Sequence, residues 1–572
     1  MKLRKFFRIT CIVIGIIMLL PLFSACDKKD ATKEQPSPTS QAEQTPTPEV
    51  TKQEDKTPIT FTMYIPYKWW QRKWETTDIG KYVTEKTGVS FEFIITPVDN
   101  GGEKLDLMIA SDSLPDMVLI DIGAAQRKKL EDAEMVYSIE ELCNAAGSEQ
   151  LKENVGKTVM EWYRNKNNGK SYVIPNFVST EQELNNDPSV TIENRYGWSA
   201  RADIYKAIGS PDTSTVEGFI NALKLAKQKF PEVDGKPLIP FIFNDYQPNW
   251  HEVFDAVICG SFDASSFPNE DDAFNNFRFP FTLDKYKEAV KFVNTLIREG
   301  LAPKEYYAYK SEQVGELVAS GRVFVIAGHN EGDIYKRYAN LYLEKNPEAG
   351  YVGIEPPRNS KGDKPKFNAA VGLGWNTTLV SKKCKDVARA AKFITWASSE
   401  EGNSVFEWGV PGLHYTEIKD GVPVYTQEVI DARKNKYGEI FQDKMGFDCF
   451  WFFGYKGAKE KLVKAMLRDD FTKSRYAVAN KYSYVVPLWQ RIEGFGFEPD
   501  SPESLLEKKA YEEIRGRALP KMFLAKDDAT FEKEWNDMVN KINSLPGLNN
   551  YYQEVMKRTK QKYEKYQQMM KK

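Results

Sequence analysis

The stretch Leu114-Pro115-Asp116-Met117-Val118-Leu119-Ile120-Asp121 is an apolar run that a proline introduces and an aspartate ends. Such a run predicts a buried β-strand. Two earlier β-type runs, 59–64 and 89–95, flank a helix pattern at 78–87, and a second helix pattern covers 104–111. The order strand, helix, strand, helix, strand predicts an α/β fold with a parallel sheet.

The rest of the chain is richer in helix patterns. Residues 216–230 and 285–300 carry apolar side chains at three- and four-residue spacing, as core-facing helices do. A third stripe of this kind consists of Phe531, Trp535, Met538, Val539, Ile542 and Leu545. A body of roughly 515 residues is too large for one small core, so two large lobes are expected.

The first 25 residues have the pattern of a secretory signal peptide. A basic start precedes an apolar run at 9–23 that is too short for a comfortable membrane span. The end, Leu22-Phe23-Ser24-Ala25-Cys26, resembles the bacterial lipobox, although that pattern usually has leucine in place of Phe23. We expect Cys26 to become the lipidated N-terminus, with an uncleaved anchor or an ordinary secretory signal as alternatives. Residues 26–57 have the polar, proline-rich composition of a flexible stalk.

The charge balance argues against nucleic acid as a partner. Lys and Arg number 79 and Asp and Glu number 81, and loss of the signal peptide takes the net charge from −2 to about −6. The chain has three histidines, and it contains no phosphate loop, dinucleotide fingerprint or serine-hydrolase elbow. We therefore expect no cofactor, no metal and no catalysis.

Four cysteines remain after the signal peptide and Cys26: Cys143, Cys259, Cys384 and Cys449. Their spacing is not that of a metal site. Two disulfides are conceivable in an exported protein, but buried free thiols are the simpler interpretation.

Several separate stretches resemble, in order, the extracellular solute-binding lipoproteins of carbohydrate ABC importers, in particular the family 1-like, large Gram-positive branch. Each stretch is weak alone, and their shared order carries the resemblance. They are Leu114-Pro115-Asp116; Gly169-Lys170-Ser171-Tyr172-Val173-Ile174-Pro175; 198–219 with Arg201, Asp203, Gly209, Pro211 and Thr213; Gly321-Arg322-Val323-Phe324-Val325; 390–396 followed by Glu401-Gly402; and Gly409-Val410-Pro411-Gly412-Leu413-His414-Tyr415.

The resemblance implies a type II periplasmic-binding-protein-like fold, with two discontinuous α/β lobes joined by a hinge. Lobe one would hold 58–178 and 322–372, and lobe two 179–321 and 373–572. The ligand would lie between the lobes, a usual place for a small-molecule site. Many relatives carry a calcium loop after the helix that ends near Phe230, but this chain lacks its oxygen ligands, so no calcium is expected.

Stacking of sugar rings on aromatic side chains makes the exposed tryptophans the first candidates for ligand contacts. A packed core position is the competing interpretation for each of them. The aromatic candidates are Trp69 and Trp70 after the first strand, Trp198 at the start of a matched segment, Trp250 in a polar turn, Trp375 after Gly374, Trp408 before Gly409, and Trp451.

Four polar residues complete the expected ligand site. Asp121 falls at the carboxyl end of the apolar strand, where open α/β sheets bind ligands. Arg201 matches the family's Arg-x-Asp segment, although a structural ion pair with Asp203 is an equal alternative. Asn330 and Glu331 follow the apolar run 323–327.

Together these features predict a monomeric, lipid-anchored protein on the outer face of the cytoplasmic membrane of a Gram-positive bacterium. It would capture a saccharide, most simply an oligosaccharide, and deliver it to the permease subunits of an ABC transporter. A secreted glycosidase or lyase with two acidic residues is the enzyme alternative. A receptor lipoprotein that binds a signal without transport is the third class.

Overall fold

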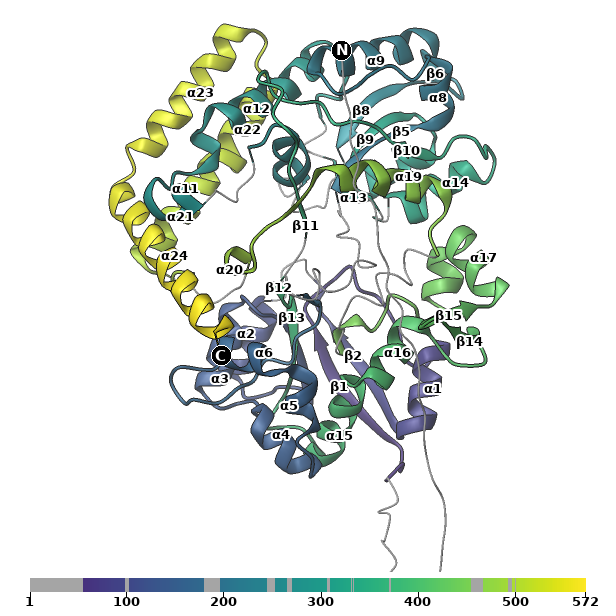
Figure 1. Ribbon diagram of the computed structural model, residues 1–572, viewed down its shortest axis with the longest axis vertical. Helices are drawn as coiled ribbons and strands as arrows, with labels where there is room; N and C mark the ends of the chain where they lie inside the picture. Colours follow the sequence, from purple (N-terminus) through teal and green to yellow (C-terminus); the bar gives the residue numbers. More distant parts are fainter. Residues whose placement is uncertain are drawn as a thin grey trace, which may run out of the picture. The chain divides into compact units, whose positions relative to one another are not determined.

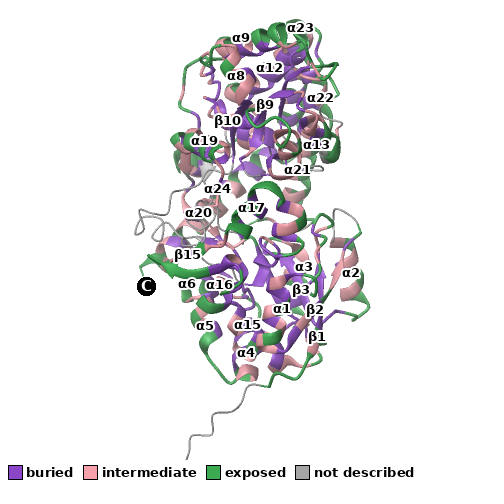
Figure 2. Ribbon diagram, turned by 90° about the vertical axis from the view of Figure 1, so that its right-hand side faces the viewer, coloured by how far each residue is buried: buried purple, intermediate pink, exposed green. Residues whose placement is uncertain are grey.

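Two four-stranded sheets organise the chain in the computed structural model (Figure 1). The structure describes residues 55–97, 102–179, 196–243, 253–264, 270–305, 309–330, 332, 334–369, 372–453, 467–491, 496–498 and 500–571. Buried residues concentrate on the strands of both sheets (Figure 2).

The first sheet has the strand order β13-β3-β1-β2. Its strands are β1 (Ile59–Ile65), β2 (Val89–Ile95), β3 (Met117–Asp121) and β13 (Asn376–Val380). β1 lies parallel to both β2 and β3, whereas β13 runs antiparallel to β3. The parallel β-α-β-α-β unit expected from the sequence is confirmed.

Local sequence signals explain where the helices of this part begin and end. Thr77 caps α1 by accepting a hydrogen bond from the backbone N–H of Gly80, and Gly88 closes the helix with φ 72°. The helices are α1 (Asp78–Thr87), α2 (Gly102–Ala110), α3 (Ala125–Asp132), α4 (Ile139–Ala146), α5 (Gln150–Val155), α6 (Lys157–Trp162), α15 (Val387–Ala397) and α16 (Glu400–Trp408).

The second sheet has the order β10-β5-β9-β8, with β8 parallel to β9 and β5 antiparallel to both of its neighbours. Its strands are β5 (Tyr196–Arg201), β8 (Ile239–Phe243), β9 (Val323–His329) and β10 (Tyr351–Gly353). Its main helices are α8 (Ala202–Ala207), α9 (Val216–Lys229), α12 (Asp284–Arg298), α13 (Ser311–Ala319), η4 (Ile334–Ala339), α14 (Asn340–Leu343) and α19 (Asp470–Ala479).

Shorter elements and the C-terminal helices complete the fold. Two small pairings join distant segments: β4 (Val178–Ser179) with β12 (Gly372–Leu373), and β11 (Phe367–Ala369) with β16 (Ser483–Val485). A hairpin and three helical elements follow α16, namely β14 (Tyr415–Lys419), β15 (Val422–Tyr425), α17 (Gln427–Asn435), η5 (Tyr437–Gln442) and η6 (Trp451–Phe453). The C-terminal helices are α21 (Pro502–Tyr511), η8 (Glu512–Ala518), α22 (Leu519–Phe523), α23 (Asp528–Asn543) and α24 (Leu548–Met570).

Strand pairing corrects two of the expected lobe assignments. Segment 322–372 was expected in lobe one, but β9 lies between β5 and β8 in the second sheet. Segment 373–572 was expected in lobe two, but β13 pairs with β3 in the first sheet, and α15 packs on α4. The order of segments along the chain does not fix the sheet that a strand joins. That choice depends on the strands with which it forms hydrogen bonds. The exact lobe boundaries stay a prediction.

The last helix contacts both cores. Tyr551 and Tyr552 of α24 pack in the core around the second sheet, while Tyr566 packs in the core around the first. Lys565 donates a 2.7 Å hydrogen bond to the carbonyl oxygen of Trp162 in α6. α24 therefore ties the two cores together.

Cys143, Cys259, Cys384 and Cys449 are free thiols; the prediction of buried free thiols is confirmed for three of them, whereas Cys384 is partly exposed. Among the described helices, none is long and apolar enough to cross a membrane.

Candidate ligand-binding site

One edge of the first sheet gathers side chains from distant segments. β1 is followed by Tyr67 and Trp69, and β3 ends at Asp121. Because β13 is antiparallel to β3, Asn376 at its start pairs with Asp121, and Trp375 comes just before. The predicted position of Asp121 at a strand's carboxyl end is confirmed, and ligands of open α/β sheets bind at such edges.

Four rings at this edge form the aromatic wall: Tyr67, Trp69, Trp375 and Trp451. The ring centroids of Trp375 and Trp451 are 4.9 Å apart with an interplanar angle of 18°, and those of Trp69 and Trp451 are 6.2 Å apart at 16°. The Tyr67 ring lies 5.3 Å from both Trp69 and Trp375. Aromatic pairs in such contact stabilise each other by about 0.5–1.5 kcal/mol beyond their area burial.

The wall keeps two open tryptophan faces. Trp69 is 62% exposed and Trp375 is 42% exposed, whereas Trp451 is buried among its neighbours and orients them. Exposed apolar side chains that lie together, unlike single ones, often mark a ligand or partner site. The wall therefore suits a ligand with a flat apolar face.

Polar groups lie beside the rings. The Tyr67 hydroxyl donates to Oδ1 of Asp121 and accepts a 3.1 Å hydrogen bond from Nδ2 of Asn376. Asp121 is open to solvent on one side, but its neighbours exclude water from the rest of its carboxyl group. This desolvation raises the pKa of the carboxyl. The hydrogen bond from Tyr67 lowers the pKa but does not cancel the effect. Burial, then the Asp121 charge, raises the pKa of Tyr67. Within the described residues Oδ2 of Asp121 accepts no hydrogen bond, so it can accept one from a ligand.

The backbone beside the wall is strained. Phe177 has φ 51°, a left-handed conformation that costs a side-chain-bearing residue about 1–3 kcal/mol. Its ring lies 6.1 Å from Trp375 and 6.0 Å from Trp451. Gly374 has φ 112°, and a Cβ there would meet Cβ of Pro175 at 2.6 Å. Strain of this kind concentrates at ligand sites and hinges, because only a rigid surrounding maintains it.

Two buried amides at the same edge are incompletely bonded. Oδ1 of Asn176 accepts a 2.9 Å hydrogen bond from the backbone N–H of Asn376. Nδ2 of Asn176 and Oδ1 of Asn376 have no hydrogen-bond partner in the described part of the chain. Each buried polar atom without a partner lowers the free energy of unfolding by about 1–3 kcal/mol. The two amides therefore make this edge of the sheet less stable.

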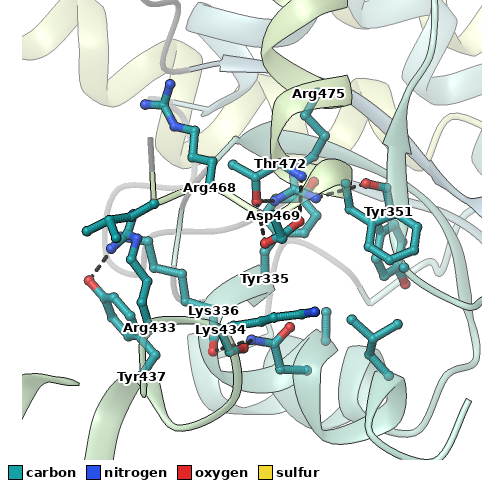
Figure 3. Close-up of a pocket in the computed structure, with 16 residues that line it drawn as sticks. Tyr335, Lys336, Tyr351, Arg433, Lys434, Tyr437, Arg468, Asp469, Thr472 and Arg475 are labelled. Atoms are coloured by element: carbon teal, nitrogen blue, oxygen red, sulfur yellow. Dashed lines mark hydrogen bonds between the residues drawn. The ribbon is translucent and has the colours of Figure 1, made fainter. Parts of the chain in front are cut away.

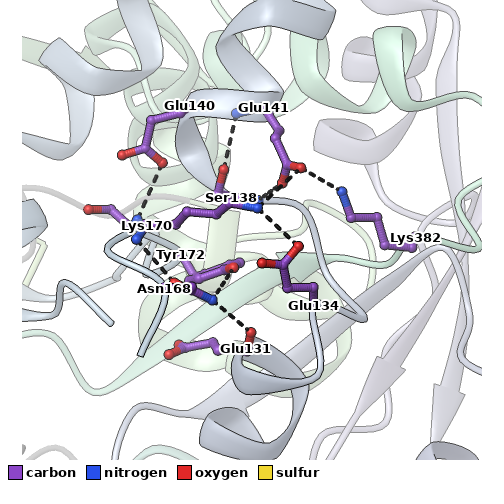
Figure 4. A network of polar contacts seen from close by, with 10 residues as sticks. Glu131, Glu134, Ser138, Glu140, Glu141, Asn168, Lys170, Tyr172 and Lys382 are labelled. Carbon is purple, nitrogen blue, oxygen red and sulfur yellow. Dashed lines mark hydrogen bonds and ion pairs between the residues drawn. The ribbon is translucent and has the colours of Figure 1, made fainter. Parts of the chain in front are cut away.

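A polar network anchors the segment that leads into the strained turn (Figure 4). Ser138 and Glu141 form a capping box at α4, with hydrogen bonds of 2.8 and 3.2 Å. The Glu141 carboxylate also binds Lys382 at 2.9 Å and lies 3.7 Å from Lys170, which pairs with Glu134. Burial alone would raise the pKa of Glu141, but the Ser138 N–H and Lys382 hold it below the usual range.

Three candidate tryptophans besides Trp451 are buried, which argues against the ligand contacts predicted for them. Trp70 donates a 2.8 Å hydrogen bond to the carbonyl of Cys449, and Trp198 donates one of 2.8 Å to Ser261. Trp408 is buried beside Tyr415. A ring that packs in a core has no face to offer, and the sequence could not separate these rings from exposed ones.

Arg201 and Asn330 are also structural. The Arg201 guanidinium is buried, binds both carboxylate oxygens of Asp203 and lies 5.0 Å from the Tyr342 ring centroid. The structural ion pair with Asp203 is thus confirmed, and a ligand contact of Arg201 stays a prediction. Asn330 is buried against Gly197 of β5, which argues against the ligand contact predicted for it. Trp250, Glu331 and Cys26 lie outside the described residues.

The sequence argument missed Tyr67, Asn176, Phe177 and Asn376. Tyr67 is two residues before Trp69, and Asn376 follows Trp375, so both had a neighbour among the candidates. Asn176 and Phe177 had no such signal, because a positive φ at a phenylalanine is visible only in coordinates.

The fold and this site define a class of protein: two α/β sheets with separate cores and discontinuous segments, as in periplasmic-binding-protein-like solute-binding proteins. The chain belongs to the bacterial extracellular solute-binding protein family, whose model matches residues 79–408. Lipoprotein LipO of Bacillus subtilis (strain 168) is 25% identical over 231 residues, which are 39% of this chain and 44% of that protein. The match thus spans less than half of that relative.

Solved structures share the fold over most of the chain. The alginate-binding protein AlgQ2 without calcium ion has a TM-score of 0.61 at 19% identity, covering 88% of this chain and 98% of that one. An extracellular solute-binding protein from Bifidobacterium longum subsp. infantis has 0.58 at 14%, with coverage of 88% and 98%. FusA, an ABC-transporter substrate binding protein of S. pneumoniae in complex with kestose, has 0.57 at 18%, with coverage of 88% and 99%. The predicted two-lobe fold is confirmed.

Proposed function

We propose that this solute-binding protein captures a saccharide on the aromatic wall. The observation that carries the proposal is the pair of open faces of Trp69 and Trp375 beside Oδ2 of Asp121, which accepts no hydrogen bond from the residues that the structure describes. A pyranose presents flat C–H surfaces to aromatic rings and hydroxyl groups in its plane to carboxylates and amides. The wall offers both kinds of contact on one sheet edge.

The names of the structural relatives support the same class of ligand. AlgQ2 is described as alginate-binding, and FusA was solved with kestose. At 18–19% identity these proteins share the fold with this chain, and the saccharide is our proposal for it.

We further propose that the protein is monomeric, carries no cofactor and catalyses no reaction. Cys26 would hold it by lipid on the outer face of the cytoplasmic membrane, and it would deliver the saccharide to the permease subunits of an ABC transporter. The family's description as extracellular and the name of Lipoprotein LipO support this placement. Trp451 would support the ligand-facing rings, and Trp250 and Glu331 stay predicted contacts.

A thermal-shift screen tests the proposal. The purified protein is heated with neutral and acidic oligosaccharides of two to six units, with peptides and amino acids as controls. A saccharide at a hundredfold its Kd should add about 2.7 kcal/mol to the free energy of unfolding and raise Tm. If peptides raise Tm and no saccharide does, the proposal is refuted.

A second measurement tests the absence of catalysis. The protein is incubated with each saccharide that raises Tm, and new reducing ends are followed over time. We expect none. Sustained turnover would replace the proposal by that of a glycosidase or lyase.

A further inference from the structure

The carboxylate of Asp121 carries a negative charge that no cation in the described part of the chain balances. It accepts a hydrogen bond from the Tyr67 hydroxyl, and it forms no ion pair with a described lysine, arginine or histidine. Arg127, which follows β3, binds the carboxylate of Glu131 and the carbonyl oxygen of Ile122 instead. The charge at this edge of the first sheet is therefore uncompensated.

The other end of the same strand shows how this protein holds a structural carboxylate. Asp116, which precedes β3, accepts hydrogen bonds from the backbone N–H and the hydroxyl of Thr62, both at 2.8 Å. It also accepts one of 2.9 Å from the N–H of Lys385, whose ammonium group lies 3.3 Å away. Asp121 has no comparable set of donors among the described residues. A neutral asparagine could accept the Tyr67 hydrogen bond equally well, so the charge of Asp121 points to a ligand.

The open ring faces beside Asp121 add to the negative potential. The face of an aromatic ring is the negative part of its quadrupole, and tryptophan attracts a cation over its face better than other rings do. Trp69 and Trp375 are both exposed. The Tyr67 ring lies 5.3 Å from each of them, and its hydroxyl binds Asp121. A carboxylate and two tryptophan faces around one tyrosine form a combination that suits an ammonium group.

Cations that gather elsewhere in the fold do not act on Asp121. Figure 3 shows a hollow among η4, α17, η5 and the start of α19 that several lysines and arginines line. There Arg433 lies 3.6 Å from the carboxylate of Asp448, and Arg475 donates a 2.8 Å hydrogen bond to the carbonyl oxygen of Tyr351. None of the residues that line this hollow belongs to the aromatic wall. The negative charge of Asp121 is thus left for a ligand.

A neutral sugar and an amino sugar would meet this charge differently. Hydroxyl groups that cover Asp121 donate hydrogen bonds, but they displace water from the carboxylate without supplying a counter-charge, and burial of an unpaired charge is unfavourable. A protonated amine supplies both the hydrogen bond and the charge, and such charge-assisted bonds are roughly twice as strong as neutral ones. The sugar ring that carries the amine still stacks on the wall through its C–H face.

We infer that the preferred solute is a cationic amino saccharide, whose rings stack on Trp69 and Trp375 while a protonated amine binds the carboxylate of Asp121. This inference rests on the proposed function and names its substrate class. The aromatic wall selects a sugar ring, and Asp121 selects a sugar that carries an unmodified amine.

Calorimetry with matched probes tests the inference. The amino probes are trimers of glucosamine and of galactosamine. Each is compared with its N-acetylated form and with the parent trimer, which has a hydroxyl group in place of the amine; tetramethylammonium chloride represents a free cation. Binding is measured at about pH 6, where sugar amines carry a proton. We expect the amino probes to bind at least about tenfold more tightly than either neutral form, with a preference that shrinks as salt rises from about 0.05 to about 0.5 M.

Two variants locate the effect. Asp121→Asn keeps an acceptor for Tyr67 but removes the charge. It should weaken the amino probes at least about tenfold and the N-acetylated probes at most about threefold, because only the amino probes lose a charge pair. Asp420→Asn is the matched control, since it makes an equal charge change at the exposed turn between β14 and β15, where φ of 53° suits asparagine. It should bind every probe like the wild type.

The outcomes separate the inference from the proposed function. If neutral or acidic saccharides bind as tightly as the amino trimers, or if Asp121→Asn behaves like Asp420→Asn, the inference is overturned and the proposed function stands. If tetramethylammonium alone binds as tightly as the amino trimers, the site serves a free cation and the inference is again overturned. If no saccharide of any charge binds, the proposed function itself fails.

Discussion

Removal of the Trp375 ring is the most direct perturbation of the aromatic wall. A tryptophan side chain presents on the order of 250 Å², and Trp375 is 42% exposed, which leaves about 100 Å² for a ligand. If a saccharide covers half of this area, about 25 cal/mol per Å² gives about 1.3 kcal/mol. Trp375→Ala should therefore weaken binding close to tenfold.

The protein should remain as stable as the wild type, because Trp375 is largely at the surface. Trp375→Phe keeps a ring face and should lose less affinity than the alanine variant. Trp198→Phe provides the control, since Trp198 belongs to the core around the second sheet. It should lower Tm, while the folded protein keeps its affinity.

Isothermal calorimetry with a saccharide from the thermal-shift screen measures these effects. Each variant is first compared with the wild type by thermal unfolding, so that loss of folded protein is not mistaken for loss of affinity. Unchanged Kd, within a factor of two, for alanine variants of both Trp69 and Trp375 would show that the aromatic wall does not bind the ligand.

Three other perturbations have defined outcomes. Asp121→Asn should weaken ligand binding and raise Tm at pH 7. Tm rises because desolvation raises the pKa of the Asp121 carboxyl, so that its ionisation above this pKa lowers the stability of the wild type. The Tm difference should vanish near pH 3, where the wild-type carboxyl is protonated, and an equal difference at both pH values would contradict this assignment. Gly374→Ala should lower the free energy of unfolding by about 1–3 kcal/mol, because φ at this residue is 112° and the new Cβ meets Pro175. Denaturant unfolding measures this free energy. An unchanged value would mean that the backbone at residue 374 relaxes to accept the side chain. Cys26→Ser should move the protein from the membrane fraction to the culture supernatant, and wild-type retention on membranes would rule out the lipid anchor.

Short-range signals in the chain specify the local elements of the first sheet. The apolar run that ends at Asp121, the N-cap Thr77 and the stop at Gly88 specify strands and helix ends through short-range interactions. These signals lie within a few residues of one another, so a pattern along the chain suffices to read them. The position of Asp121 at a strand end follows from the same local pattern.

Which distant segments meet depends on long-range contacts. β13 joins β3 across more than 250 residues, and that pairing places Trp375 beside Tyr67 and Trp69. No local pattern encodes such a pairing, because strand partners compete through long-range hydrogen bonds and side-chain packing. The same reason explains the tryptophans: Trp69 and Trp70 are adjacent in sequence, yet one is 62% exposed and the other 2%. Whether a ring faces solvent or core depends on which distant elements cover it, and only the folded chain settles that.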